Sequence, residues 1–147
     1  MGSTRIHLLI ATLALGSAGL AAPAEAPVIH FAEVVKANPL DPVRGAAITE
    51  VARGEQASVN VWQMTKGLPA HFHRQHEEVI IVQSGRAQAR IGDRTLTMQA
   101  GDMVLIPKGT IHKVRALGDE PFRGISVFAP VFDGKDRIMV EESQPPK

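Results

Sequence analysis

Residues 67–85 read GLPAHFHRQHEEVIIVQSG, and this stretch decides the fold. His71 and His73 are separated by one residue, and Glu78 opens an apolar run that ends before Gly85. On a β-strand, side chains at positions i and i+2 lie on the same face, about 6.5–7 Å apart along the strand. The two imidazoles can therefore reach one ion, and a carboxylate on a neighbouring strand can reach the same ion.

A second stretch, residues 101–112, reads GDMVLIPKGTIH and ends on another histidine. His112 follows a Pro-x-Gly turn and shares a predicted strand face with Val114, while Lys113 points the other way. We therefore expect His112 to face the interior. A lone histidine is usually structural, and we interpret His30 as structural or exposed. A pair of histidines followed by a carboxylate and a third histidine instead indicates a metal site.

Short apolar runs separated by Gly, Pro and Asp residues fill the chain from residue 46 onward. At spacings of about 8–12 residues, such runs predict the strands of an all-β sandwich or barrel. Lys66–Pro69 breaks one run, and beyond the first 24 residues no window shows a helical period over three or four turns. The expected strands are Ile48–Ala52, Ala57–Met64, Glu78–Gln83, Ala87–Ile91, Thr95–Met98, Met103–Ile106, Ile111–Leu117 and Phe122–Phe128.

The composition excludes several classes of protein. The chain has 147 residues and no cysteine, so it has no disulfide, no thiolate-ligated metal and no thiol nucleophile. Its length allows one domain with a single core. With 16 basic and 15 acidic side chains the formal net charge is +1, and there is no basic run. Nucleic acid is therefore not expected as a partner.

Residues 1–24 are predicted to be a signal peptide. Arg5 supplies a positive charge, Leu8–Ala22 is almost wholly apolar, and Ala22-Pro23-Ala24 offers a cleavage site after Ala24. The apolar run is shorter than the roughly 20 residues that span a bilayer, so an uncleaved anchor is the weaker alternative. We expect the mature protein in the periplasm or outside a bacterial cell, with no stable membrane span after cleavage.

The remaining chain is divided into three parts. Residues 25–45 contain three prolines and are expected to form a loop-like N-terminal extension. Residues 46–140 hold the predicted strands and are expected to form the barrel. Residues 141–147 are polar and contain two prolines, so we expect a flexible tail.

The two quoted stretches resemble the two sequence motifs of the cupin superfamily. The first motif is a Gly, then HxH, three or four residues, a Glu, six residues and a Gly. Glu78, rather than Glu77, leaves the six-residue gap before Gly85. The second motif is a Gly, five residues, Pro-x-Gly, two residues and a His, and residues 101–112 match it. Two positions depart from the family pattern: Gly67 lies three residues before HxH rather than five, and Ala116 stands where an Asn is common.

This resemblance implies a double-stranded β-helix (jelly-roll) barrel with a metal ion inside one end. The ligands that it implies are His71, His73, Glu78 and His112. Three neutral imidazoles and one carboxylate suit one divalent transition metal, and without a thiolate the donors do not select among Mn, Fe, Co, Ni, Cu and Zn. Small cupins are often homodimers, and the apolar side chains of Val79 and Ile81 on the second face of their strand favour a homodimer here.

The sequence favours a metal-dependent enzyme that acts on a small oxygenated molecule, with oxygenase-type chemistry. A non-enzymatic module that binds metal and a small ligand is the main alternative, and a metal-dependent lyase, decarboxylase or isomerase is another. Glu77 and His76, which we do not expect to bind the metal, are the candidates for a general base. Specificity is expected to depend on side chains that line the barrel, such as Phe72, Ile80, Val114 and Phe128.

Overall fold

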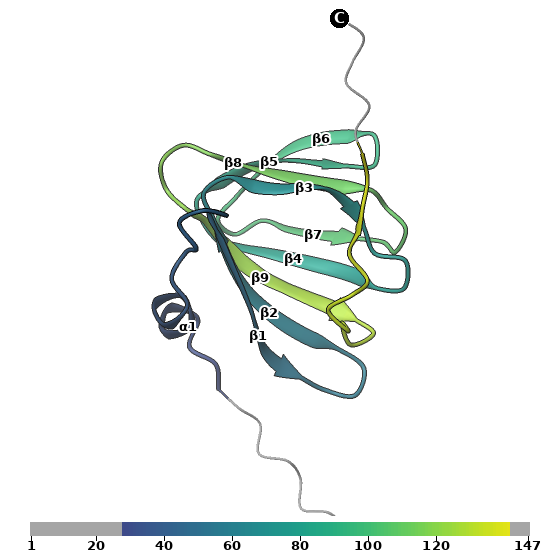
Figure 1. Cartoon of the computed structure of the whole chain (residues 1–147), viewed down its shortest axis with the longest axis horizontal. Coiled ribbons are helices and arrows are strands. Elements are labelled where there is room, and N and C mark those ends of the chain that lie inside the picture. The colour runs from purple at the N-terminus through teal and green to yellow at the C-terminus, as the bar shows by residue number, and fades with distance from the viewer. Residues whose placement is uncertain (1–27, 142–147) are drawn as a thin grey trace, which may run out of the picture.

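The computed structural model describes residues 28–141 and shows two antiparallel sheets that face each other (Figure 1). One sheet has the strand order β1-β2-β9-β4-β7 and the other has the order β10-β3-β8-β5-β6. The predicted all-β, double-stranded β-helix barrel is confirmed. Its elements are α1 (Phe31–Ala37), β1 (Ala46–Arg53), β2 (Ser58–Met64), β3 (Gly67–Phe72), β4 (Glu77–Ser84), β5 (Arg86–Ile91), β6 (Arg94–Gln99), β7 (Met103–Ile106), β8 (His112–Leu117), β9 (Phe122–Ala129) and β10 (Ile138–Met139).

The core lies between the two sheets and follows from the alternation along each strand. In β4 the side chains of Glu78, Ile80 and Val82 are buried, whereas Val79 and Ile81 are half-buried on the outer face. On β2, Trp62 and Met64 belong to the core.

The predicted break at Lys66–Pro69 is wrong, because β3 begins at Gly67. Leu68 pairs with Val114 and His71 pairs with His112, so two residues of β3 (69 and 70) lie opposite one residue of β8 (113). The extra residue makes a β-bulge that includes Pro69. Proline has no N–H group, and it is tolerated here because a bulge residue need not donate a hydrogen bond to the neighbouring strand. The bulge is what places His71 directly opposite His112.

The N-terminal extension is not purely loop-like, because it contains the helix α1. The helix has only seven residues, so the apolar spacing of Phe31, Val34 and Val35 is too short to show a helical period over three or four turns. It is held by Gln63, whose side-chain amide donates hydrogen bonds to the carbonyls of Val35 and Asn38. No helix among the described residues is long and apolar enough to cross a membrane. The predicted signal peptide, residues 1–24, and most of the predicted tail lie outside the described residues, and they stay predictions.

Candidate metal centre

Three histidines from one sheet meet inside the barrel. His71 lies on β3, His73 follows the last residue of β3, and His112 opens β8. Each offers a ring nitrogen, and these atoms lie within 4.8 Å of one another. All three side chains are about 2% exposed. The structure thus brings together the three histidines that the sequence singles out, and we call them the histidine cluster.

The backbone fixes which nitrogen of each ring faces the cluster. The Nδ1 atom lies 2.8 Å from the carbonyl of Pro69 for His71 and 2.9 Å from that of Thr110 for His112. The Nδ1 atom of His73 lies 2.5 Å from the carbonyl of Asp136. A carbonyl oxygen can only accept, so each Nδ1 carries a proton, and Nε2 is the ring atom that can offer a lone pair to the cluster. Such an arrangement orients imidazoles toward a metal ion.

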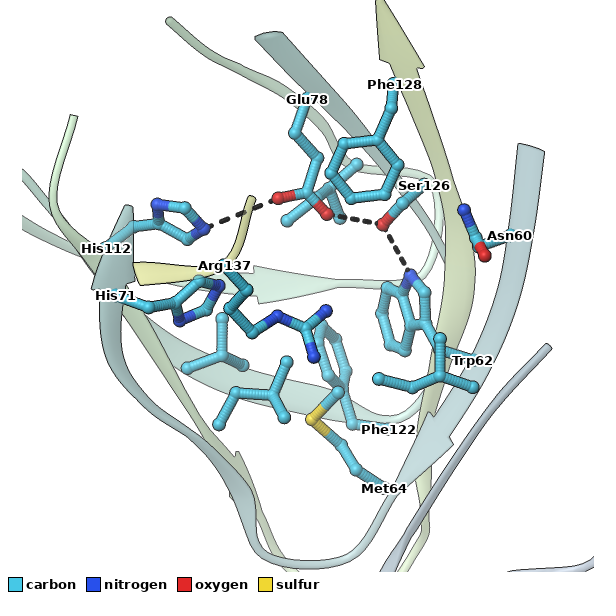
Figure 2. A pocket seen from close by; sticks show the side chains of 14 residues that line it. Asn60, Trp62, Met64, His71, Glu78, His112, Phe122, Ser126, Phe128 and Arg137 are labelled. Atoms are coloured by element: carbon cyan, nitrogen blue, oxygen red, sulfur yellow. Dashed lines mark hydrogen bonds and ion pairs between the residues drawn. The ribbon is translucent and has the colours of Figure 1, made fainter. Parts of the chain in front are cut away.

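Glu78 reaches the cluster from the opposite sheet. Its Oε2 atom lies 3.5 Å from Nε2 of His73 and 3.4 Å from Nε2 of His112. Its Oε1 atom accepts a 2.6 Å hydrogen bond from the Ser126 hydroxyl, and that hydroxyl accepts a 2.9 Å hydrogen bond from the Trp62 indole (Figure 2). The hydrogen bond from Ser126 leaves Oε2 facing the histidines. The centre is therefore built across the interior, with nitrogen donors from one sheet and an oxygen donor from the other.

The charges of these groups fit a bound cation. Burial lowers the pKa of His71 to about 4, so this ring is neutral at neutral pH. Burial works to raise the pKa of Glu78, but the adjacent His112 and His73 rings and the hydrogen bond from the Ser126 hydroxyl outweigh it and hold that pKa well below its usual range. The Nε2 atoms of His73 and His112 are buried and have no hydrogen-bond partner. Lone pairs and a carboxylate that converge in a buried site require a positive charge between them.

Asp136 is a site residue that sequence reasoning missed. Its backbone carbonyl accepts the hydrogen bond from His73, and its carboxylate accepts from the backbone N–H groups of Arg74 and Gln75 and from the His76 ring. Burial raises the pKa of Asp136, but the hydrogen bonds from Gln75, His76 and Arg74 outweigh it and lower the pKa to about 2. Asp136 lies some 60 residues further along the chain, so no local motif indicates it.

The two general-base candidates lie away from the interior of the cluster. Glu77 is exposed at the start of β4, on the face opposite Glu78. His76 is buried, but its Nδ1 atom lies 2.6 Å from the Asp136 carboxylate and its Nε2 atom 3.0 Å from the carbonyl of Val131. Both ring nitrogens of His76 are thereby engaged in contacts that hold the loop between β3 and β4.

A cavity of about 470 Å³, including its mouth, opens beside the cluster (Figure 2). His71, His112 and Glu78 contribute to its wall, and most of its other lining side chains are apolar. The predicted lining residues Ile80, Val114 and Phe128 are among them. Phe72 is not, because it alternates with the inward-pointing histidines on either side. The polar side chains of Asn60 and Arg137 also line the cavity, and the sequence did not single them out.

Comparisons with known proteins agree with this architecture. The family described as the cupin domain matches residues 59–128. An uncharacterized protein of Aquifex aeolicus (strain VF5) is 30% identical over 71 residues, which are 48% of this chain. The match spans only 58% of the length of that relative.

Solved structures give the same result for the fold. A conserved protein with a double-stranded β-helix domain from Klebsiella pneumoniae is 26% identical, with a TM-score of 0.64 over 76% of this chain and 90% of that one. KdgF from Halomonas sp. is 22% identical, with a TM-score of 0.59 over 64% and 86% of the two chains. A variant of Streptomyces PAC13 with uridine is 17% identical, with a TM-score of 0.60 over 73% and 88%. Pac13 is described as a nucleoside dehydratase.

Proposed function

Because the chain belongs to the cupin superfamily, we propose that it is a metal-dependent enzyme that acts on a small oxygenated molecule. The observation that carries this proposal is the convergence of three Nε2 lone pairs and one carboxylate oxygen at the wall of a cavity. His71, His73, His112 and Glu78 would hold one divalent transition metal. When bound, such an ion supplies a Lewis acid with open positions for a substrate oxygen or dioxygen.

The side chains around the cavity favour oxygenase-type chemistry over proton-transfer chemistry. The titratable side chains in its wall are those of His71, Glu78, His112 and Arg137. The first three belong to the proposed metal site, and a guanidinium is always protonated. Glu77 and His76 do not line the cavity. Among the residues that the structure describes, the cavity wall thus offers no free general base, which a lyase, decarboxylase or isomerase that moves protons through a side chain would need. The apolar walls would hold the substrate and keep bulk water out.

Oxygen uptake tests this proposal. We expect protein of confirmed metal content to consume dioxygen with at least one member of a panel of diketones, phenols and flavonols. The His112→Ala variant should lose at least 99% of this rate, because the ion loses a ligand. The His30→Ala variant is the matched control, since His30 is exposed and lies outside the cluster, and it should keep the wild-type rate. If metal-loaded protein consumes no dioxygen with any compound, the oxygenase proposal is wrong, and a binding module or a lyase takes its place.

We also propose that two copies associate through the outer face of the sheet that contains β7. Two rows of apolar side chains cross β9, β4 and β7 on this face. One row contains Val127, Val79 and Leu105, and the next contains Ile125, Ile81 and Met103. Helix α1 packs on β2, which leaves this part of the face uncovered by the described residues. Met103 is 71% exposed and Leu105 is 55% exposed on an edge strand. An edge strand with a continuous apolar face can pair with its own copy about a two-fold axis.

Light scattering after size-exclusion chromatography measures this association. The wild type should have the mass of a dimer at micromolar concentration, and the Met103→Lys/Leu105→Lys double variant should have the mass of a monomer. Met139→Lys, at a residue that is 55% exposed on the other sheet, is the control and should stay dimeric. A monomeric wild type would refute the proposed dimer.

A further inference from the structure

Two polar groups in the cavity wall have no partner. Nε of Arg137 and Nδ2 of Asn60 are buried, and neither makes a hydrogen bond. Figure 2 shows the Arg137 side chain extending into the cavity between His71 and Trp62. Buried donors are almost always hydrogen bonded in folded proteins, so each such exception needs an explanation.

Among the lining residues, the half-buried side chain of Arg137 has no free carboxylate to pair with. Glu78 is the one carboxylate among the lining residues, and both of its oxygens are engaged, one by Ser126 and the other by the histidines. The neighbours of Arg137 in the wall include the apolar side chains of Met64 and Phe122. A guanidinium against such walls is costly unless an anion joins it. The described residues of the cavity supply no such anion, whereas a ligand carboxylate could supply it.

From this geometry we infer that the cavity binds a small carboxylate whose carboxyl group lies on the Arg137 guanidinium. This inference rests on the proposed function, because it names the substrate class of the same site. The planar guanidinium matches a carboxylate with two parallel hydrogen bonds, and Asn60 supplies a further donor to an oxygen of the ligand. With the carboxylate so held, the apolar walls accommodate a short hydrocarbon body, and a hydroxyl or keto oxygen can face the histidine cluster.

A phosphate ester is the other anion that a guanidinium binds well. Its dianion usually recruits several cations or backbone N–H groups, whereas this cavity offers one arginine and one amide as free donors. The balance of one positive charge against mostly apolar walls therefore favours a monocarboxylate over a phosphate.

Calorimetric titration of the full chain loaded with Zn²⁺ tests the inference. Metal content is measured first by elemental analysis, so that a failure of the metal site is recognised separately from a failure of carboxylate binding. The probes are 2-hydroxy-3-methylbutanoate, its neutral amide and 2-methylpropyl phosphate. We expect the carboxylate to bind at least tenfold more tightly than the amide or the phosphate.

The variants assign this preference to Arg137. Arg137→Gln should keep its Zn²⁺ and weaken carboxylate binding by roughly 30-fold or more, while Arg137→Lys should recover part of the loss. Asn60→Leu should weaken binding by roughly threefold to tenfold. Arg94→Gln, at an exposed position on β6, is the control and should bind as the wild type does. Unchanged affinity in Zn²⁺-loaded Arg137→Gln, equal affinity for the amide, or tighter binding of the phosphate would each overturn the inference.

Discussion

Replacing His112 or His71 by alanine should reduce bound metal from about one ion per chain to less than one tenth of an ion. Each substitution removes one of the three nitrogen donors and leaves a gap that no other described side chain of the cluster can fill. Loss of a donor from a site of three or four ligands removes most of its affinity. Elemental analysis after dialysis against a weak chelator measures the effect.

The matched control for these variants is His30→Ala. His30 precedes α1, is exposed and makes no side-chain cap, so its removal should leave both the fold and the metal content unchanged. Circular dichroism should show that His112→Ala and His71→Ala remain folded. Folded variants with wild-type metal content would show that the histidine cluster is not the metal site.

Replacing Gly67 by alanine should destabilise the protein by about 4 kcal/mol or more, enough to leave much of a domain of ordinary stability unfolded. Gly67 has a φ of +139°, which side chains rarely adopt, and a Cβ atom there would lie 2.1 Å from the carbonyl oxygen of Val114. That oxygen belongs to the backbone of β8, so relief requires β3 to move away from β8. Such a movement would also separate His71 from His112.

Gly118→Ala gives a reference for the cost of a side chain at positive φ where the added atom meets nothing. Gly118 has a φ of +80°, and a Cβ atom there would meet nothing within 4 Å. This variant carries the conformational cost alone, about 1–2 kcal/mol. Urea denaturation in the presence of EDTA should therefore give a clearly larger loss for Gly67→Ala than for Gly118→Ala. Equal losses would mean that the close approach of β3 to β8 does not constrain the barrel.

The barrel and the histidine cluster could be predicted because both are carried by local patterns. Short runs of apolar residues bounded by Gly, Pro and Asp mark strands such as β4 and β9 in the sequence itself. The HxH spacing places two rings on one face, and the six-residue gap before Gly85 singles out Glu78 from Glu77. In the structure Glu78 faces the cluster, whereas Glu77 is exposed.

The features that escaped prediction depend on contacts between distant segments. Asp136 and Arg137 come from an irregular segment before β10, and only the folded chain brings them to His73 and to the cavity. The sequence around Pro69 predicts the end of a strand, because proline is rare inside strands, whereas the structure has a bulge there. Helix α1 has only seven residues, which is too short for a helical period to be visible in the sequence. No pattern of neighbouring residues encodes these contacts.

The most direct test of the metal centre is anomalous X-ray scattering from a crystal of the protein grown with the metal that it retains on purification. We predict one strong anomalous peak at bonding distance from Nε2 of His71, His73 and His112 and from Oε2 of Glu78. The energy of the absorption edge would identify the element. A crystal of metal-containing protein whose anomalous peak lies elsewhere, or at a site without these histidines, would contradict the proposed centre.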